Sequence, residues 1–365
     1  MPIQRRVTLK MIAEKAGVHY STVSLALNDR PGIPEVTRDH VKKIAEAMGY
    51  RPDPLLSALA TYRSSKIRKI AHESIAWVDF WPPPKSSRKG FRALWAGASK
   101  RAEMLGWKLD EVCAGHSGHS PEEIGRILKA RGIEGVLIAP QDVENLVMNL
   151  DWSGFSAITM AHTLAQPRLH RVQPHQFYNM QVLMRELFAL GYRRPGLCLG
   201  RYSHGHTDHY WRAGFLDAQA PLPREDRVPP FEGDPEVARG LLGWFERELP
   251  DVIVTSRPEV IIQVIESKGV RVPRDVGVAA PSFKVEDWHP DCGKAGRGFS
   301  ASGIDISGVD EDFEKIGEAM IDLVVSMIHR HETGVPVSPI HHLIEGRWHA
   351  GKTLKRAKSK GRKRL

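Results

Sequence analysis

Apolar residues in the first fifty positions recur at helical spacing in three short stretches. The first stretch follows Thr8, a residue type that caps helix N-termini, and it ends at Gly17, a residue type that terminates helices. The apolar positions are Leu9, Ile12, Ala13 and Ala16, then Val23, Ala26 and Leu27, then Val41, Ile44, Ala45 and Met48. Two short helices joined by a tight glycine-containing turn form a helix-turn-helix, and the second helix is expected at about residues 20–27. The third helix would supply the small core that the first two need.

From residue 73 onward, short apolar runs alternate with amphipathic helical patterns. The runs that predict strands are residues 73–80, 108–114, 135–140, 151–162, 171–176, 196–200, 251–256 and 276–280. The patterns that predict helices are residues 91–107, 120–132, 178–192, 208–219, 237–249, 259–269 and 312–330. Ser120 and Pro121 suit the start of the second of these helices, and Gly191 suits the end of the third. This alternation is typical of parallel sheets with crossover helices.

Basic residues are concentrated at the two ends of the chain. Residues 1–70 carry 13 Lys/Arg against 6 Asp/Glu, and residues 355–365 carry 7 Lys/Arg and no acidic residue. The segment between them has more acidic than basic residues, although the whole chain has a net charge of +9. A basic head suits contact with DNA phosphates. The tail, KRAKSKGRKRL, is expected to be disordered, and it either adds nonspecific attraction to DNA or only keeps the protein in solution.

Length and cysteine use narrow the class of protein further. A chain of 365 residues with 41% apolar residues can bury the cores of two or three domain-sized units. Cys113, Cys198 and Cys292 are odd in number and far apart, which favours a reducing cytosol over a disulfide framework. No apolar signal region opens the chain and no apolar span reaches membrane length, so we expect a cytoplasmic protein and not a secreted receptor.

The stretches TLKMIAEKAGVHYSTVSLALN and GYRPDPLLSALA resemble the lactose-repressor (LacI/GalR) family of bacterial transcription regulators. The resemblance implies an all-α helix-turn-helix head with a hinge helix, followed by an α/β, periplasmic-binding-protein-like domain of two lobes with parallel sheets. It divides the chain into a DNA-binding domain at 1–60 with its hinge helix at 53–60, a linker at 61–72, an effector-binding and dimerisation domain at 73–354, and the tail. The implied function is a homodimeric regulator, a repressor, that binds a pseudo-palindromic double-stranded DNA operator.

The family resemblance also implies which head residues contact DNA. The second helix would enter the major groove, where Tyr20, Ser21 and Leu25 would contact bases. The family usually has Arg at the position of Leu25, and Arg pairs with guanine, whereas leucine offers only apolar contact, for example with a thymine methyl group. The positions that match family residues touching phosphate or framing the helix are Thr8, His19, Thr22, Ser24, Asn28, Thr37 and Tyr50.

The segment after the third helix matches the family's hinge helix, which lies in the minor groove. Pro54 suits the first turn of such a helix, with Asp53 as its cap. Leu56 and Leu59 are expected to contact DNA, with Leu59 as the wedge that opens a base step. The alternative is that Leu55, Leu56 and Leu59 pack onto the core of the head. A segment this short is not helical alone in water, so it would fold only with DNA and a second copy present.

The order of elements in the larger domain implies a cleft between two lobes. Segment 302–330 should return to the first lobe and segment 341–354 should end in the second, so the chain crosses between the lobes three times. A small-molecule effector would bind in the cleft at that hinge. The candidate effector-binding residues are Trp81, His162, His175, Trp211, Arg212, Ser256, Arg257 and Ser282. For Trp81 the alternative to contact with the effector is that its side chain is buried as a packing anchor, and the sequence favours neither.

Sugar-responsive family members carry polar groups at positions where this chain departs from the pattern. Where they have a carboxylate, an Arg, an Asn-Asp pair and an Asp, this chain has Ala161, Trp211, Ser256 with Arg257, and Ser282. Paired carboxylates hold sugar hydroxyls, so the ligand is expected to be an acidic sugar or a phosphorylated metabolite, held by His162, His175, Arg212 and Arg257. A cleft without any effector is the alternative.

One stretch resembles a catalytic metal motif. His204, His206, Asp208 and His209 spell H-x-H-x-D-H, the signature of metallo-β-lactamase-type hydrolases. No second His/Asp set follows, so neither a metal, a cofactor nor an enzymatic activity is expected. Residues 296–303 lack the spacing of a phosphate loop, and His341 and His342 would point to opposite faces of a strand. The alternatives are a metal-dependent hydrolase fused to a DNA-binding head and a ligand-independent activator or architectural protein.

Overall fold

The computed structural model describes most of the chain as two compact units, Met1–Ala71 and His72–Leu365. The described residues are 7–27, 33–50, 74–80, 90–113, 119–141, 145–200, 207, 209–235, 237–283 and 304–355. The predictions that lie outside these residues concern Asn28, the hinge helix 53–60 with Leu56 and Leu59, the linker 61–72, Trp81, His204, His206, Asp208, the stretch 296–303 and nearly all of the tail.

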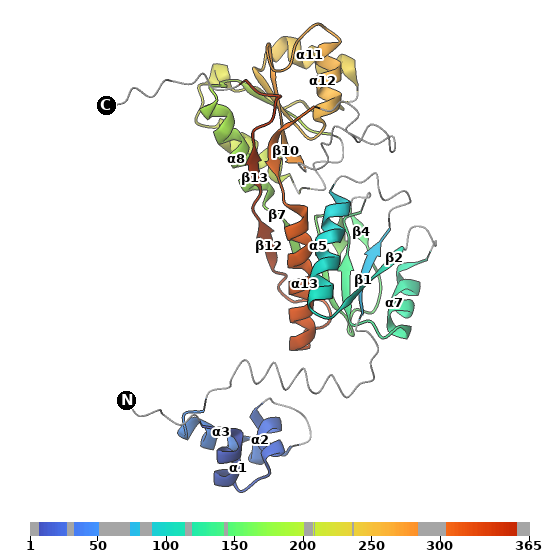
Figure 1. The fold of residues 1–365 in the computed structure, drawn as a ribbon, viewed down its shortest axis with the longest axis vertical. Helices are drawn as coiled ribbons and strands as arrows, with labels where there is room; N and C mark the ends of the chain where they lie inside the picture. Colours follow the sequence, from blue (N-terminus) through green and yellow to red (C-terminus); the bar gives the residue numbers. More distant parts are fainter. Residues whose placement is uncertain are drawn as a thin grey trace, which may run out of the picture. The chain divides into compact units, whose positions relative to one another are not determined.

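The amino-terminal unit contains three helices around a small core. These are α1 (Leu9–Ala16), α2 (Tyr20–Leu27) and α3 (Glu35–Ala47), shown in blue in Figure 1. Thr8 caps α1 by accepting a hydrogen bond from the Met11 amide at 3.4 Å, and Gly17 ends the helix with a left-handed φ of 64°. The residues buried at the centre are Ile12, Ala13, Val23, Ala26, Val41 and Ala45. The predicted helix-turn-helix and the bounds of its second helix are confirmed.

The first lobe of the larger unit has a six-stranded sheet in which every pairing is parallel, in the order β12-β7-β5-β3-β1-β2. The strands are β1 (Ser74–Asp79), β2 (Lys108–Cys113), β3 (Gly135–Ile138), β5 (Ser156–Met160), β7 (His170–Pro174) and β12 (His341–Ile344). Helices α5 (Phe91–Met104) and α13 (Phe313–Arg330) cover one face, and α7 (Pro121–Ala130) covers the other. Alternate residues of each strand face the two helical layers.

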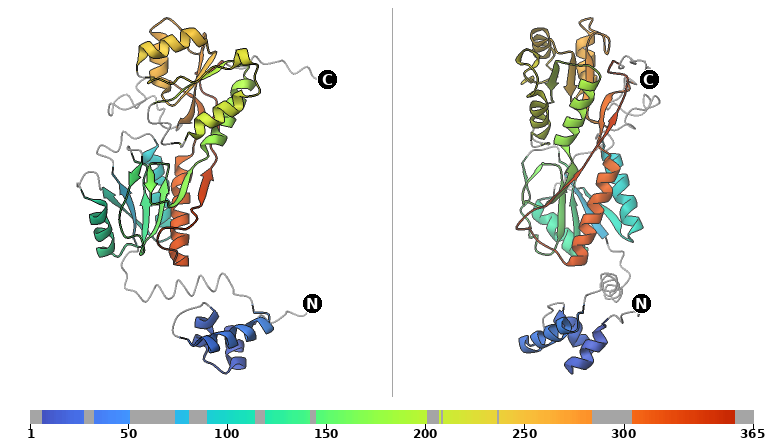
Figure 2. Two further views of the ribbon diagram at one scale, coloured as in Figure 1. Left: turned by 180° about the vertical axis from the view of Figure 1, so that it is seen from behind. Right: turned by 90° about the vertical axis from the view of Figure 1, so that its left-hand side faces the viewer.

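Helices α5 and α13 pack at unusually short range, side by side in Figures 1 and 2. A Cβ atom added to Gly97 would lie 2.1 Å from the carbonyl oxygen of Glu314, and one added to Gly317 would lie 2.1 Å from that of Leu94. Glycine is therefore required at both positions, because any side chain would separate the helices.

The second lobe has a five-stranded sheet in the order β13-β11-β10-β9-β8. The strands are β8 (Pro195–Cys198), β9 (Val252–Thr255), β10 (Gly277–Phe283), β11 (Ser307–Asp310) and β13 (Arg347–His349). Helices α8 (Gln176–Ala189) and α10 (Tyr210–Gln219) cover one face, and α11 (Ala238–Glu248) and α12 (Pro258–Glu266) cover the other. The predicted parallel arrangement holds except for β13, which is antiparallel to β11.

The chain crosses between the lobes three times, as predicted. The crossings lie between β7 and α8, between β11 and α13, and between β12 and β13. The second crossing comes later than expected, because β11 still belongs to the second lobe and the return begins only after Asp310. A small parallel pair, β4 (Leu146–Val147) with β6 (Leu164–Gln166), was not anticipated. The fold class of a helical head followed by a two-lobed α/β domain is confirmed.

Candidate functional site

The start of α2 presents a row of solvent-exposed side chains. Tyr20 is 52% exposed and Leu25 is 40% exposed, although both are large and partly apolar. His19 and Ser21 are exposed as well, whereas Val23 on the opposite side of the helix is buried in the core. Ser21 and Leu25 are four residues apart and so share one face of the helix. This face is free to contact a partner outside the head.

His19 fixes the geometry at the start of α2. Its Nδ1 accepts a hydrogen bond from the Ser21 amide at 3.4 Å and lies 2.8 Å from the Ser21 hydroxyl. A backbone amide only donates, so Nδ1 carries no proton and the neutral ring has its N–H at Nε2. The Tyr20 ring lies 5.0 Å from the imidazole, between centroids. The imidazole therefore caps the helix with one nitrogen and keeps a donor on the other.

The other candidate DNA contacts in the head lie around this row. Thr8 is exposed and caps α1, and Thr22 and Ser24 are half-buried on α2. Thr37 is half-buried in the first turn of α3, and Tyr50 packs against the core of the head just after that helix. Their roles in binding DNA stay predictions.

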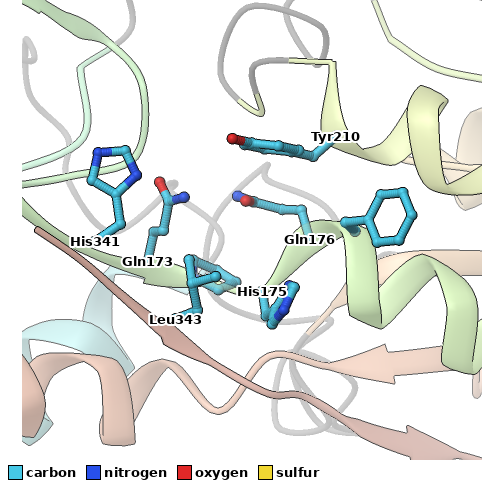
Figure 3. Close-up of a pocket in the computed structure, with 8 residues that line it drawn as sticks. Gln173, His175, Gln176, Tyr210, His341 and Leu343 are labelled. Atoms are coloured by element: carbon cyan, nitrogen blue, oxygen red, sulfur yellow. The ribbon is translucent and has the colours of Figure 1, made fainter.

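In the larger unit, a pocket of about 100 Å³ lies where the first and third crossings run side by side. The described residues that line it are Gln173, Pro174, His175, Gln176, Phe177, Tyr210, His341 and Leu343. Gln173 comes from β7 of the first lobe, Gln176 is the first residue of α8, and Tyr210 is the first residue of α10. Figure 3 shows the two glutamine side chains extended toward each other beneath the Tyr210 ring.

Two buried amide oxygens distinguish this pocket. Gln173 is 1% exposed and Gln176 is 5% exposed. The Oε1 atom of each glutamine is buried and makes no hydrogen bond within the described part of the chain. Buried polar atoms in proteins are nearly always paired, so two unpaired acceptors in one pocket require an explanation. Both oxygen atoms are covered by protein atoms, so the open part of the pocket is lined by other atoms of these two side chains.

His162 lies at the border of the pocket, at the end of β5. Its Nδ1 is 2.8 Å from Nη1 of Arg171, and because a guanidinium only donates, this nitrogen is the acceptor. The His162 ring lies 5.6 Å from the Tyr210 ring and 6.3 Å from the His341 ring, between centroids. The candidate residue His162 therefore meets two of the lining residues without lining the pocket itself.

The other candidate residues near α8 and α10 have different roles. His175 lines the pocket, but its Nδ1 accepts a hydrogen bond from the Tyr178 amide at 3.3 Å and so caps α8. Trp211 is only 7% exposed and packs in the core between α8 and α10. Arg212 forms an ion pair with Glu232, with 2.6 Å between Nη1 and Oε1, and is not among the described residues lining the pocket.

The last three candidates lie near the carboxyl ends of β9 and β10. The Ser256 hydroxyl accepts a hydrogen bond from the Gly200 amide at 2.9 Å, and Arg257 begins α12 as its cap residue. Ser282 lies 2.5 Å, between Oγ and Oε2, from the carboxylate of Glu311, which is 3% exposed. Ser282 stands where sugar-responsive family members have an Asp, and a carboxylate that the sequence analysis did not consider, that of Glu311 just after β11, lies beside it. The acidic run after that strand was the signal that sequence analysis overlooked.

Most residues of the pocket were also missed in the sequence. Gln173, Gln176, Tyr210 and Leu343 belong to no motif, and His341 was taken for an ordinary strand residue. The feature of the sequence that could have pointed to these pocket residues is the polar run around Gln173 and Gln176, which interrupts an otherwise apolar strand and helix. His341 and Leu343 come close to that run only because β12 pairs with β7.

Among the described residues, no group of three or more His, Cys, Asp or Glu side chains could hold a metal ion. His209, the last residue of the H-x-H-x-D-H stretch, precedes α10 with a left-handed φ of 59°. No helix in the described part of the chain is long and apolar enough to cross a membrane.

Two family models match the chain, one for each structural unit. The model described as bacterial regulatory proteins, lacI family, matches residues 8–53, and that of the periplasmic binding protein-like domain matches residues 184–353. The HTH-type transcriptional regulator CelR of Thermobifida fusca is 23% identical over an alignment of 363 positions, and this alignment covers 94% of this chain and 97% of CelR. The lacI family model, at residues 8–53, spans all three helices of the head.

Two solved structures share the fold over nearly the whole chain. The complex of the transcriptional regulator CelR with cellobiose has a TM-score of 0.54 at 19% identity, covering 95% of this chain and 100% of that one. The lac repressor dimer bound to operator and the anti-inducer ONPF has a TM-score of 0.54 at 17% identity, covering 96% of this chain and 100% of that one. At these identities the likeness shows a shared fold.

Proposed function

This chain belongs to the lacI family of bacterial regulatory proteins, and from that premise we propose that it represses transcription as a homodimer on a pseudo-palindromic operator. The observation that carries the proposal is the exposed row at the start of α2, within a head that matches the family over residues 8–53. A second copy is supported by the lac repressor, which was solved as a dimer on its operator. Two heads related by a two-fold axis require two half-sites.

The base contacts are assigned to the exposed face of α2. Tyr20, Ser21 and Leu25 are exposed on α2, and a major groove admits a helix of this size. Leu25 makes apolar contact only, so the half-site differs from the family's usual site at the base that Arg would pair with. The basic head supplies contacts to phosphates, which position the helix but do not select the sequence.

The hinge segment 53–60 gives the protein its switch. Leu59 enters the minor groove as an apolar wedge, beside Leu56, and the hinge segment of the second copy lies next to it at the centre of the operator. Opening a base step costs a few kcal/mol and is offset by the contacts that the bent duplex gains. The segment is helical only on DNA, so its ordering is sensitive to how the larger domains are held.

A small-molecule effector between the lobes controls the ordering of the hinge segment. The fold supports this assignment, because three crossings form a hinge and a pocket lies at two of them. CelR was solved with cellobiose, which supports a sugar-derived effector here. A ligand shifts the equilibrium between lobe angles only by its difference in affinity for them. No chemical step is required, and none is proposed.

A binding-site selection on the full-length protein, followed by gel shift, tests the proposal. The selected site should be pseudo-palindromic, and the complex should contain two copies of the chain. Leu59→Ala should weaken binding and reduce DNA bending, whereas Leu216→Ala, an exposed leucine on α10, should change neither. Equal affinity and bend for Leu59→Ala would discard the wedge. A monomeric protein that binds no selected oligonucleotide would overturn the function.

A further inference from the structure

We propose that His19 fixes the direction of the Ser21 hydroxyl, so that Ser21 binds the exocyclic amino group of an adenine or a cytosine in the major groove. The proposal rests on the proposed function, since it concerns a base that α2 contacts, and it names the chemical group that Ser21 selects. A serine with a free hydroxyl either donates to a base or accepts from one, so it discriminates poorly. In this chain His19 removes one of the two options.

The Ser21 hydroxyl is the donor in its contact with His19. Nδ1 of the imidazole accepts a hydrogen bond from the Ser21 amide at 3.4 Å, so this nitrogen carries no proton. The Ser21 Oγ atom lies 2.8 Å from the same nitrogen. Because an unprotonated ring nitrogen only accepts, the hydroxyl supplies the hydrogen of this contact. A serine hydroxyl has one hydrogen and two lone pairs, so Ser21 keeps acceptor capacity alone.

The first turn of α2 holds the imidazole in this position. The His19 carbonyl oxygen accepts hydrogen bonds from the amides of Thr22 at 2.9 Å and Val23 at 3.3 Å, so His19 is the cap residue of the helix. The Tyr20 ring lies 5.0 Å from the imidazole, between centroids, at an interplanar angle of 55°. Val23 is buried in the core of the head. The core therefore positions the turn that carries both the imidazole and the Ser21 hydroxyl.

DNA binding strengthens this constraint on Ser21. His19 and Ser21 are both exposed, so in the free protein water competes for the partner of each group. A base that covers Ser21 excludes this water. A hydroxyl turned toward a base acceptor would leave Nδ1 with only its longer contact to the Ser21 amide, and a poorly paired nitrogen in the interface is costly. Ser21 therefore binds a donor more tightly than an acceptor.

Two bases present a donor in the major groove. Adenine presents its N6 amino group and cytosine its N4 amino group, whereas guanine presents acceptors at O6 and N7 and thymine presents one at O4. A serine that only accepts therefore contacts the adenine of an A·T pair or the cytosine of a G·C pair. Since every base pair contains one amino-bearing base, the identity of the selected pair does not show which group is bound. Deletion of single groups does.

The contacted pair is found by binding-site selection with the full-length parent and with Ser21→Ala, as the position whose preference the variant loses. The amino group is then deleted by purine in place of adenine or by pyrimidin-2-one in place of cytosine. The acceptors are deleted by the 7-deaza form of the purine, by 5-methylpyrimidin-2-one in place of thymine, or by 2-aminopurine in place of guanine. Amino deletion should weaken binding of the parent about fivefold, and acceptor deletion about twofold or less. In Ser21→Ala both deletions should have the same small effect, which measures changes in the duplex itself.

Variants of His19 test its role as a positioning residue. His19→Gly removes the imidazole and keeps a residue type that is tolerated at a helix cap. Its loss of affinity on amino deletion should fall to about twofold, because the Ser21 hydroxyl is then free to bind either kind of group. His19→Asn keeps an acceptor oxygen at the cap and should restore the fivefold loss. His40→Ala, at an exposed histidine of α3, should bind like the parent.

The ratio between the two deletions separates a positioning role from a structural one. A merely structural His19 would weaken binding to every duplex equally in His19→Gly and leave the ratio unchanged, which would overturn the proposal. A parent that loses more affinity on acceptor deletion than on amino deletion would overturn it too, as would identical selected sites for the parent and Ser21→Ala. A parent that selects no operator at all would overturn the proposed function and this inference with it.

Discussion

The backbone amide of Gly346 donates a 2.9 Å hydrogen bond to Oδ1 of Asn179, a residue with no solvent exposure. Asn179 belongs to α8, which follows the first crossing, and Gly346 lies in the third. The bond thus fastens the third crossing to the helix that follows the first crossing. A Cβ atom at Gly346 would lie 2.6 Å from Cγ1 of Val309 and 2.7 Å from the carbonyl oxygen of Asp310.

Gly346→Ala should therefore destabilise the larger unit. The added methyl group meets a backbone oxygen that cannot move aside, and overpacking of this kind costs about 1–3 kcal/mol. Urea denaturation followed by fluorescence measures the change. Gly243→Ala is the matched control, because its Cβ would meet nothing within 4 Å on α11, and alanine in a helix gains about 0.5–1 kcal/mol over glycine. Equal stability of the two variants would contradict the close packing at the third crossing.

Leu25→Arg should change which DNA sequence is selected without changing stability. Leu25 is 40% exposed, so the substitution leaves the core of the head intact. An arginine there pairs with guanine through two hydrogen bonds, a contact that discriminates between bases by about 1–3 kcal/mol. Binding-site selection should be carried out with the parent protein and with the variant. Only the variant should enrich a guanine at one position in each half-site. An unchanged site would mean that this face of α2 does not contact bases.

Operator affinity should fall steeply with added salt. Each phosphate neutralised by the basic head releases counterions, so a protein with six to ten such contacts loses about a thousandfold or more in affinity between 50 and 200 mM salt. Fluorescence anisotropy across that range measures the slope. A chain ending at Lys355 should keep its preference for the operator but bind nonspecific DNA more weakly. A flat salt response would contradict phosphate contact by the head.

Cys198 should resist modification in the folded protein. It is fully buried in the second lobe, and burial raises the pKa of its thiol to about 12, with the charge of Asp234 as a smaller cause. The thiolate is the reactive form, and an unperturbed thiol has a pKa of about 8.5. In a Cys113→Ser, Cys292→Ser variant, a thiol reagent at pH 8 should label Cys198 only after unfolding in urea. Rapid labelling of the native variant would contradict the packing of α11 and α12 over β8.

The sequence predicted those parts of the fold in which the local pattern of apolar residues is compatible with only one type of secondary structure. Helix α2 was placed at residues 20–27 because Val23 and Ala26 are its inward positions. Strands such as β3 and β9 are continuous apolar runs, which is typical of strands covered on both faces. Strand β11 was not recognised, because SGVD carries a single large apolar residue and its pairing with β10 decides the conformation.

The candidate sites were predicted unevenly for a related reason. The candidate DNA-contact residues lie between Thr8 and Leu59, and the resemblance of that stretch to the family is enough to propose them. The pocket combines Gln176 with His341, which are far apart in the sequence and meet because β12 joins the edge of the first sheet beside β7. Glu311 was overlooked because it is of interest only through its contact with Ser282, which lies on the neighbouring strand. Contacts of this kind depend on topology, and residue types alone do not reveal them.

The close packing of α5 against α13 has a consequence for synthesis. Helix α5 (91–104) packs against α13, which begins only at Phe313, and the edge of the first sheet pairs with β12, which ends at Ile344. Both partners are therefore synthesised long after α5. While the ribosome adds the intervening residues, only α5 is available to cover that face of the sheet, and the part that α13 covers in the folded protein stays open. The lobe that is translated first is therefore among the last to mature, and chaperones have their longest access to that face.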